Sequence, residues 1–336
     1  MAVRPTPASG ESLSGRHSAN NPTRQRESFL KIVVTEFMDA PAVDRLREKA
    51  EVTYDPQLVD NLPQLLEQAE HCDAIIVRNR TQVRGELLAS LKRCKVVGRL
   101  GVGLDNIDLD GCQRQGIQVF PATGANANSV AEYVIATALL LLRGSYASTE
   151  AVAAGLWPRD ALSKGREIAG KKLGLLGFGS IGQLTARLAK ALGMSVMAFD
   201  PAMADDNPVF GHLGVTASDL DRLVAESDVI SLHMPLLEST RDFFDARRIQ
   251  AMKPGAILIN TARGGIVDEL AVAAALRSGQ LGGAALDVFK DEPLAAAPHF
   301  RDCPNLILTP HTAGLTMESN QRVSSLVAEK VLEALA

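Results

Sequence analysis

The sequence predicts an α/β fold with two parallel-sheet domains, and three observations lead to this prediction. The chain has 336 residues, whereas single domains commonly have about 100–200. From Lys31 onward, short apolar runs alternate with longer segments of helical period, which is typical of βαβ units. A second series of the same kind opens with a glycine-rich turn at residues 177–182, so we expect two sheets, the second of them larger.

The first series contains five predicted strands, separated by helical segments such as PAVDRLREK and GELLASLKR. Each strand is a short apolar run followed by turn residues or by a helical segment. The five runs begin at Lys31, Glu51, Ala74, Lys95 and Ile117.

A long helix is expected next, from about Asn128 to Tyr146. Its apolar residues run nearly all the way round, so we expect it to be buried. A polar connection follows, which contains the only tryptophan, Trp157. The second series then begins with KLGLLGFG and continues through VMAFD, VISLH, AILIN, GAALDVF and LILTP, and a final helix is expected from about Thr316 to Leu335.

Composition excludes several classes of protein. With a net charge of −4 and 4% aromatic residues, the chain lacks the basic excess and the stacking aromatics of nucleic-acid binders. Its most apolar stretch, Val134–Leu142, has nine residues, against about 20 for a membrane-spanning helix. No CxxC spacing occurs among Cys72, Cys94, Cys112 and Cys303, which predicts no disulfide framework and no metal site. Reduced thiols are typical of a cytoplasmic protein.

Residues 1–29 differ from the rest of the chain, because they are rich in Ser, Pro, Asn and Arg and nearly free of large aliphatic residues. They lack the apolar stretch of a secretory signal and have too few apolar side chains to form a core. We therefore expect a disordered tail. A transit peptide is the alternative, since basic residues outnumber acidic ones in this segment.

The glycine-rich turn reads GFGSIG, a G-x-G-x-x-G pattern between an apolar strand and a helical segment. Gly177 permits the tight turn, Gly179 lets the backbone approach a pyrophosphate, and Gly182 lets the helix pack close to the strand. The diphosphate would bind free N–H groups at the helix N-terminus, where Ser180 and Ile181 lie. The pattern predicts a Rossmann-like dinucleotide site.

Asp200 indicates which dinucleotide binds there. It ends the next predicted strand, 23 residues after Gly177. A carboxylate at this point accepts hydrogen bonds from a ribose 2′-hydroxyl and repels a 2′-phosphate. Because no basic residue stands next to Asp200, we expect NAD rather than NADP.

Five motifs, in this order, make the chain resemble the D-isomer-specific 2-hydroxyacid dehydrogenases, which include D-3-phosphoglycerate dehydrogenase. They are GRLGVGLDNID (98–108), GFGSIG (177–182), INTARGGIVDE (259–269), LDVFKDEPL (286–294) and TPHTAG (309–314). The resemblance implies two Rossmann-like or flavodoxin-like domains with the active site in the cleft between them. A substrate-binding domain would comprise residues 30–126 plus 313–336, and the NAD-binding domain residues 127–312.

The resemblance also implies a catalytic trio of Arg263, Glu292 and His311, and these residue types suit the chemistry. Oxidation of a secondary alcohol transfers a hydride to nicotinamide and a proton to a base. A neutral imidazole on His311 can accept that proton, and Glu292 would orient the ring and favour its charged form. Arg263 can bind the substrate carboxylate in a forked pair.

Further cofactor contacts are implied by the same resemblance. The loop with His233 and Thr240 would line the adenosine side, although a purely structural role for His233 is an open alternative. Asp287 would lie near the nicotinamide carboxamide. The set of implied cofactor residues is completed by Thr261, Ala262 and Gly314.

The predicted substrate site lies in the first domain. The exposed amides of the glycine-rich loop can bind a carboxylate as a backbone nest, with a structural turn as the alternative. Arg78 matches an arginine of phosphoglycerate dehydrogenases, and Arg80 is an additional cation. Because residues i and i+2 of an extended chain share a side, we expect both guanidinium groups to meet one anion; a solvent-exposed Arg80 is the alternative. The predicted site comprises Arg78, Arg80, Leu100, Gly101, Val102 and Gly103.

These features predict an NAD-dependent oxidoreductase that interconverts a 2-hydroxy acid and a 2-keto acid. We expect a phosphoglycerate dehydrogenase-like enzyme for a substrate with a second anionic group. The stretches RNRT and PATGAN resemble the sulfolactate dehydrogenase branch, which is one alternative. An NAD(H)-responsive, corepressor-like interaction protein is another. Family members form dimers through the NAD domain, so a homodimer is expected, without nucleic acid or membrane partners. The particular acid, its enantiomer and the direction of reaction stay open.

Overall fold

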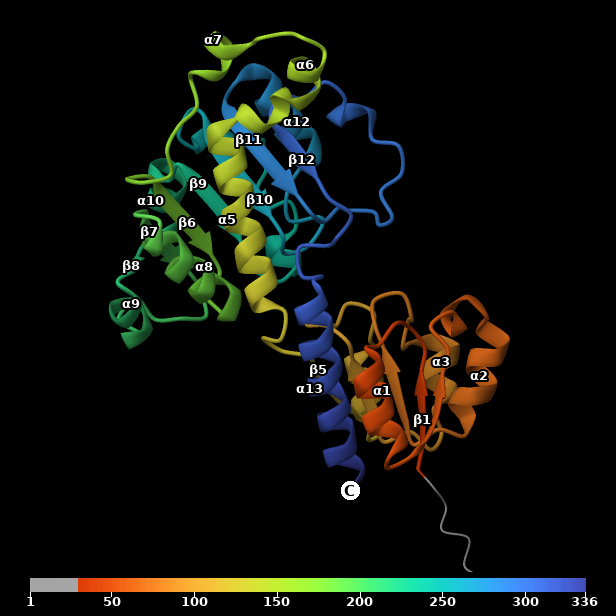
Figure 1. Ribbon diagram of the computed structural model, residues 1–336. Helices are drawn as coiled ribbons and strands as arrows, with labels where there is room; N and C mark the ends of the chain where they lie inside the picture. The colour runs from red at the N-terminus through yellow and green to blue at the C-terminus, as the bar shows by residue number, and fades with distance from the viewer. Residues whose placement is uncertain (1–29) are drawn as a thin grey trace, which may run out of the picture.

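The computed structural model describes residues 30–336, so the predicted tail of residues 1–29 lies outside the described residues. Two parallel β-sheets occupy separate lobes of the molecule (Figure 1). This arrangement confirms the predicted pair of α/β domains. In each lobe helices accompany the strands, as expected where parallel strands are joined by helical crossovers.

The first sheet has the strand order β2-β1-β3-β4-β5, with every pair parallel. This is the order of flavodoxin-like folds. The strands are β1 (Lys31–Val34), β2 (Glu51–Tyr54), β3 (Ala74–Val77), β4 (Val96–Arg99) and β5 (Gln118–Pro121). The accompanying helices are α1 (Ala40–Arg47), α2 (Leu62–Glu70), α3 (Gly85–Ser90), α4 (Leu109–Arg114) and α13 (Met317–Leu335).

The second sheet has the order β12-β11-β10-β9-β6-β7-β8, which is the Rossmann order with one strand added. Its strands are β6 (Lys172–Leu176), β7 (Ser195–Phe199), β8 (Thr216–Ala217), β9 (Val229–Leu232), β10 (Ala256–Asn260), β11 (Leu281–Leu286) and β12 (Leu306–Leu308). The helices are α5 (Ala127–Arg143), α6 (Thr149–Ala153), α7 (Arg159–Leu162), α8 (Ser180–Ala191), α9 (Pro208–Leu213), α10 (Leu220–Glu226), α11 (Ala246–Ala251) and α12 (Glu269–Ser278). The two-residue strand β8 was not predicted.

The last helix, α13, returns to the first sheet, beside which it lies in Figure 1. Its Val323, Val327 and Val331 belong to the apolar core shared with β1, β3 and β4. Gly98 in β4 makes this packing possible, because a Cβ there would lie 2.7 Å from a methyl group of Val327. Thr316 begins the helix by accepting a hydrogen bond of 3.1 Å from the Ser319 N–H.

The long helix α5 departs from its prediction in two respects. It ends at Arg143 rather than near Tyr146, because Gly144 adopts a left-handed conformation with φ of 67° and donates its N–H to the Leu140 carbonyl. One face packs against α8, β10 and β11. The opposite face is not buried as expected, since Leu139 is 39% and Leu140 36% exposed.

No single helix within residues 30–336 combines the length and the apolar character needed to cross a bilayer. The pair of α5 and the segment Ser145–Ala153, which are bent by 64° relative to each other, meets the criterion by length and composition only. Ten residues of α5 are buried inside the protein.

Candidate active site

Three neighbouring strands of the second sheet are each followed by one residue of the predicted catalytic trio. Arg263 follows β10, Glu292 follows β11 and His311 follows β12. The carboxyl ends of these parallel strands lie at one edge of the sheet, where open α/β sheets bind ligands. The topology therefore brings together three side chains that are far apart in the sequence.

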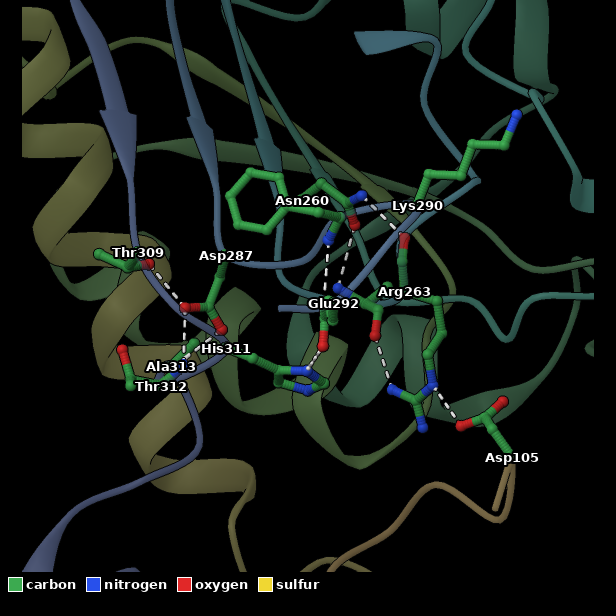
Figure 2. A network of polar contacts seen from close by, with 12 residues as sticks. Asp105, Asn260, Arg263, Asp287, Lys290, Glu292, Thr309, His311, Thr312 and Ala313 are labelled. Atoms are coloured by element: carbon green, nitrogen blue, oxygen red, sulfur yellow. Dashed lines mark hydrogen bonds and ion pairs between the residues drawn. The ribbon is translucent and has the colours of Figure 1, made fainter. Parts of the chain in front are cut away.

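His311 and Glu292 form a hydrogen-bonded pair, and Figure 2 shows their side chains pointing toward each other. His311 Nδ1 lies 2.7 Å from Glu292 Oε2, while Glu292 Oε1 accepts a hydrogen bond of 3.0 Å from the Phe289 N–H. The side chain of His311 is 45% exposed. The carboxylate thus orients the ring through Nδ1, and nearly half of the side chain is open to a ligand.

Asp287 holds the loop that carries His311. This carboxylate is 1% exposed, and it accepts hydrogen bonds from the Thr309 hydroxyl (2.6 Å), the Thr312 N–H (2.8 Å) and the Ala313 N–H (2.9 Å). The His311 N–H donates to the Asp287 carbonyl at 2.8 Å. These contacts fix His311 in a left-handed conformation with φ of 55°, which is uncommon for residues other than glycine.

The loop with Arg263 is held in a similar way by Asn260, which is 1% exposed. Asn260 Oδ1 accepts a hydrogen bond of 3.0 Å from the Ala262 N–H, and its Nδ2 donates to the Arg263 carbonyl at 2.9 Å. Gly264 passes so close to the loop after β11 that a Cβ there would overlap the Phe289 carbonyl. The Arg263 loop and the Glu292 loop therefore support each other.

Arg263 also reaches the first lobe. Its Nε donates a hydrogen bond of 2.8 Å to Oδ2 of Asp105, which comes from the segment between β4 and α4 (Figure 2). Nη1 donates to the Ala262 carbonyl at 2.6 Å. A Cβ at Gly103 would clash with Arg263 Nη2, so this guanidinium lies directly on the predicted substrate loop.

The glycine-rich loop presents free N–H groups next to Arg263. The Leu100 N–H donates to the Val77 carbonyl and the Gly101 N–H to the Arg99 carbonyl, each at 2.8 Å. The N–H groups of Val102 and Gly103 donate no hydrogen bond within the described part of the chain. Such N–H groups can bind an anion.

Arg99 is a cation of this site that we did not predict. A Cβ at Gly101 would clash with its Nη1, which places the guanidinium against the loop. Its Nε is buried and has no hydrogen-bond partner among residues 30–336. Burial, together with the positive charges of Arg263 and Arg78, lowers the pKa of Arg99 to about 10. A region with three guanidinium groups favours an anionic ligand.

Arg78 and Arg80 do not converge as expected. Arg78 donates to the Phe37 carbonyl (3.4 Å) and to Asn320 (2.7 Å), and burial lowers its pKa. Arg80 is more than half exposed and pairs with Asp60. The two side chains separate because the chain beyond β3 is not extended; it turns around a buried carboxylate from the end of β1.

The predicted dinucleotide turn lies between β6 and α8, beside the point where the strand order reverses. Gly177 has φ of 94°, and a Cβ there would lie 2.5 Å from the His233 carbonyl oxygen. At Gly182 a Cβ would lie 2.4 Å from the Gly177 oxygen. By contrast, within residues 30–336 no atom other than those of the neighbouring residues in the chain lies within 4 Å of a Cβ at Gly179. The turn is thus tight where it meets the protein and open where a pyrophosphate would bind.

The surrounding side chains fit NAD. Asp200 lies next to the turn and accepts a hydrogen bond of 2.8 Å from the Phe178 N–H. The Thr261 Oγ1 is buried and has no partner among the described residues, so it can bond a ligand. Burial lowers the pKa of His233 to about 4, so its ring is neutral at pH 7. The Thr240 hydroxyl bonds within its own turn, where it donates a hydrogen bond of 2.8 Å to the Pro235 carbonyl.

Two predicted cofactor residues lie next to the elements already described. Ala262 is 8% exposed and immediately precedes Arg263. Gly314 precedes α13, and a Cβ there would lie 2.7 Å from Asn126 Nδ2. Asp105, Arg99 and Asn260 were missed, although all three stand within the motifs at the carboxyl ends of predicted strands.

Comparison with known proteins agrees with this geometry. Residues 135–313 match the family model of the D-isomer specific 2-hydroxyacid dehydrogenase, NAD binding domain. An (S)-sulfolactate dehydrogenase of Chromohalobacter salexigens is 50% identical over 90% of this chain and 98% of its own length. A hydroxypyruvate reductase of Thermotoga maritima is 38% identical, over 91% and 98%.

A D-3-phosphoglycerate dehydrogenase of Synechocystis sp. is 36% identical over 92% of this chain, which spans 54% of that relative. Among solved structures, D-lactate dehydrogenase from Aquifex aeolicus complexed with NAD and lactic acid superposes with a TM-score of 0.80, at 30% identity, over 90% of this chain and 95% of that one. The chain belongs to the D-isomer specific 2-hydroxyacid dehydrogenases, NAD-dependent oxidoreductases that interconvert 2-hydroxy acids and 2-keto acids.

Proposed function

We propose that the protein interconverts sulfolactate and sulfopyruvate, a pair of three-carbon acids with a sulfonate as second anionic group. The observation that carries this proposal is the 50% identity to an (S)-sulfolactate dehydrogenase across 98% of that relative. The sequence prediction gave first place to a phosphoglycerate-like substrate, and the phosphorylated analogue is therefore the direct competitor in the test below.

In the proposed mechanism His311 is the acid and base. Its Nε2 accepts the proton of the substrate hydroxyl during oxidation and returns it during reduction. Glu292, 2.7 Å from Nδ1, orients the ring and stabilises the imidazolium. Arg263 and the free N–H groups of Val102 and Gly103 bind the substrate carboxylate. NAD, when bound, supplies the hydride acceptor.

The proposed cofactor residues lie at the carboxyl edge of the second sheet. The pyrophosphate would bind the open face at Gly179 and the N–H groups at the start of α8. The ribose would bind Asp200. The nicotinamide half would bind the Thr261 hydroxyl, which has no partner among the described residues. The complete proposed set is Gly177, Gly179, Ser180, Ile181, Gly182, Asp200, His233, Thr240, Thr261, Ala262, Asp287 and Gly314.

We assign the second anion of the substrate to Arg78 and Arg99. Both guanidinium groups are partly buried, and the charge of Arg78 contributes to the lowered pKa of Arg99. A sulfonate between them would relieve this repulsion and give the free Nε of Arg99 an acceptor. Pyruvate and glyoxylate, which lack a second anion, would leave the repulsion in place.

The test follows NADH absorbance at 340 nm with sulfopyruvate, phosphohydroxypyruvate, hydroxypyruvate, glyoxylate and pyruvate. We expect the highest kcat/KM with sulfopyruvate. Arg78→Gln and Arg99→Gln should raise the KM for sulfopyruvate about 10- to 100-fold, since a charged hydrogen bond contributes about 1.5–3 kcal/mol, and should barely change that for pyruvate. A preference for phosphohydroxypyruvate would show that the second anionic group of the substrate is a phosphate and not a sulfonate.

Arg80→Ala is the matched control. Its guanidinium pairs with Asp60 at the surface, so we expect the KM for sulfopyruvate to stay within about twofold of the wild-type value. A large increase in that KM would show that Arg80 does bind the substrate.

The division into domains, the quaternary state and the location are also proposals. A substrate unit of residues 30–126 plus 313–336 and an NAD unit of 127–312 are supported by the packing of α13 on α1, β4 and β5 and of α5 on α8. A homodimer through the NAD unit is supported by exposed apolar residues on and after α5: Leu139, Leu140, Tyr146, Val152, Leu156 and Trp157. Sedimentation velocity with Trp157→Glu tests the dimer. Four free cysteines support a cytoplasmic location.

A further inference from the structure

The contact between Asp105 and Arg263 joins the two lobes at the site where the substrate carboxylate is proposed to bind. Arg263 Nε donates to Asp105 Oδ2 at 2.8 Å, and the two residues are 158 positions apart in the sequence. Among the described residues, Arg263 is the one hydrogen-bond partner of the Asp105 carboxylate. This carboxylate therefore has no structural partner other than a catalytic cation.

The same edge of the guanidinium faces both Asp105 and the substrate loop. A Cβ at Gly103 would meet Arg263 Nη2 and would lie 2.8 Å from Asp105 Oδ2, so Nη2 and the Asp105 carboxylate lie close together. Nη1 is turned away and bonds the Ala262 carbonyl. The Nε–Nη2 edge is the fork that binds a carboxylate with two hydrogen bonds.

We propose that Asp105 is a built-in competitor of the substrate carboxylate. In the ligand-free protein its carboxylate holds the fork of Arg263, and the carboxylate of the 2-hydroxy or 2-keto acid displaces it. The exchange replaces one anion on Arg263 by another, so that this guanidinium has a counterion both before and after the substrate binds, beside the positively charged Arg99. This inference depends on the proposed role of Arg263 in carboxylate binding, but on no particular substrate.

The exposure of the pair supports exchange rather than a permanent structural contact. Asp105 is 62% exposed and Arg263 29% exposed, and exposed pairs are weak enough for a ligand to displace. Asp105 also lies outside the buried networks of Asp287 and Asn260 that hold the loops of the second lobe. A residue that positioned Arg263 during turnover would be expected to share that burial.

The test compares Asp105→Asn with the wild type in two measurements. The first is titration calorimetry of oxamate, a non-reactive analogue of a 2-keto acid, with the protein saturated by NADH. The second is KM and kcat for each 2-keto acid that the protein reduces. A competitor predicts that the Kd of oxamate and every KM fall about two- to fivefold, the range expected from an exposed pair, while kcat does not fall.

Asp110→Asn is the matched control, because Asp110 is an exposed acid of the neighbouring helix α4 with no side-chain contact to Arg263. It removes the same charge and should leave the Kd of oxamate and each KM nearly unchanged. An equal fall in both variants would attribute the effect to net charge and overturn the proposal.

A rise in KM together with a fall in kcat for Asp105→Asn would also overturn the proposal, since it would show that Asp105 positions Arg263 during turnover. The outcome is independent of the sulfonate proposal. Asp105 competes for the carboxylate that all 2-keto acids share, so the same factor is expected with glyoxylate or pyruvate, even if sulfopyruvate is not reduced.

Discussion

Replacement of Asp287 by asparagine tests how the active site is held together. The carboxylate is 1% exposed and accepts hydrogen bonds from the Thr309 hydroxyl and from the N–H groups of Thr312 and Ala313, at 2.6 to 2.9 Å. Asparagine has the same shape and keeps one oxygen acceptor. Its amide NH₂ would replace Oδ2 and face the Ala313 N–H, so that two donors would oppose each other.

The cost follows from these contacts. A hydrogen bond to a charged group contributes about 1.5–3 kcal/mol, and a buried donor without a partner costs about 1–3 kcal/mol. One bond is lost in Asp287→Asn and two are weakened, so we expect the free energy of unfolding to fall by about 3–5 kcal/mol. At about 2–4 °C per kcal/mol for a domain of roughly 200 residues, the melting temperature should fall by about 6–20 °C.

Thermal unfolding followed by circular dichroism measures this change, and Asp291→Asn, an exposed position in the following loop, is the control. The loop held by Asp287 carries His311, so kcat should fall in the same variant. A melting temperature within about 2 °C of the wild-type value would refute the reasoning. A raised Kd for NADH without loss of stability would show instead that Asp287 acts mainly on the cofactor.

Three further predictions use the same structure. Glu292→Gln removes the charge beside Nδ1 of His311, so kcat/KM in the 340 nm assay should fall about 10²- to 10⁴-fold with little change in melting temperature; a smaller loss would exclude the proposed dyad. Because burial lowers the pKa of His233 to about 4, the unfolded state binds the proton first as pH falls from about 6.5 to 4. His233 should therefore contribute a fall of about 3 kcal/mol in the free energy of unfolding over this range. His233→Gln should remove that contribution, so the fall between the two pH values in urea titrations should be about 3 kcal/mol smaller in the variant than in the wild type. Gly179→Ala should leave stability unchanged and raise the Kd for NADH at least about tenfold, because the added methyl group fills only space for the ligand. Gly177→Ala should instead lower the free energy of unfolding by about 2–4 kcal/mol, because this residue has a positive φ and lies against the His233 carbonyl.

Most of the fold could be predicted from periodicity, and the exceptions have local causes. Parallel strands buried on both faces are continuous apolar runs, as in β3, where all four residues are buried. Such runs are easy to identify in a sequence, and their grouping into two series predicted the two sheets. Strand β8 escaped because it has two residues and lies at the sheet edge. The end of α5 depended on one glycine with positive φ, a signal that was present in the sequence.

Burial of α5 was overestimated for a different reason. Apolar residues around a whole helix predict that every face is covered, but the sequence of one chain does not say what covers it. Within residues 30–336, one face packs on α8 and two strands, while Leu139 and Leu140 face outward. The discrepancy is itself the basis for the proposed dimer, because exposed aliphatic residues on a helix are typical of an interface.

The residues named for the active site came from motifs, and motifs do not specify which side chains meet. Arg263 and Asp105 stood in two separate motifs, and only the arrangement of the lobes shows that they form an ion pair. Arg99 also stands within a motif, but an arginine at the end of a strand is ordinary in a sequence. Its sequence position does not show that its Nε is buried without a hydrogen-bond partner among the described residues. Contacts between distant segments require the tertiary structure.

The error at Arg80 shows what such a contact can do to a local rule. Residues i and i+2 share a side only in an extended chain, and β3 ends at Val77. Glu36, which is 4% exposed, accepts hydrogen bonds from the N–H groups of Arg78, Arg80 and Thr81 at 2.9 to 3.1 Å. This carboxylate curls the loop around itself, directs Arg78 toward α13 and leaves Arg80 to Asp60. A buried acid more than 40 residues earlier in the sequence thus decides where the two arginine side chains point.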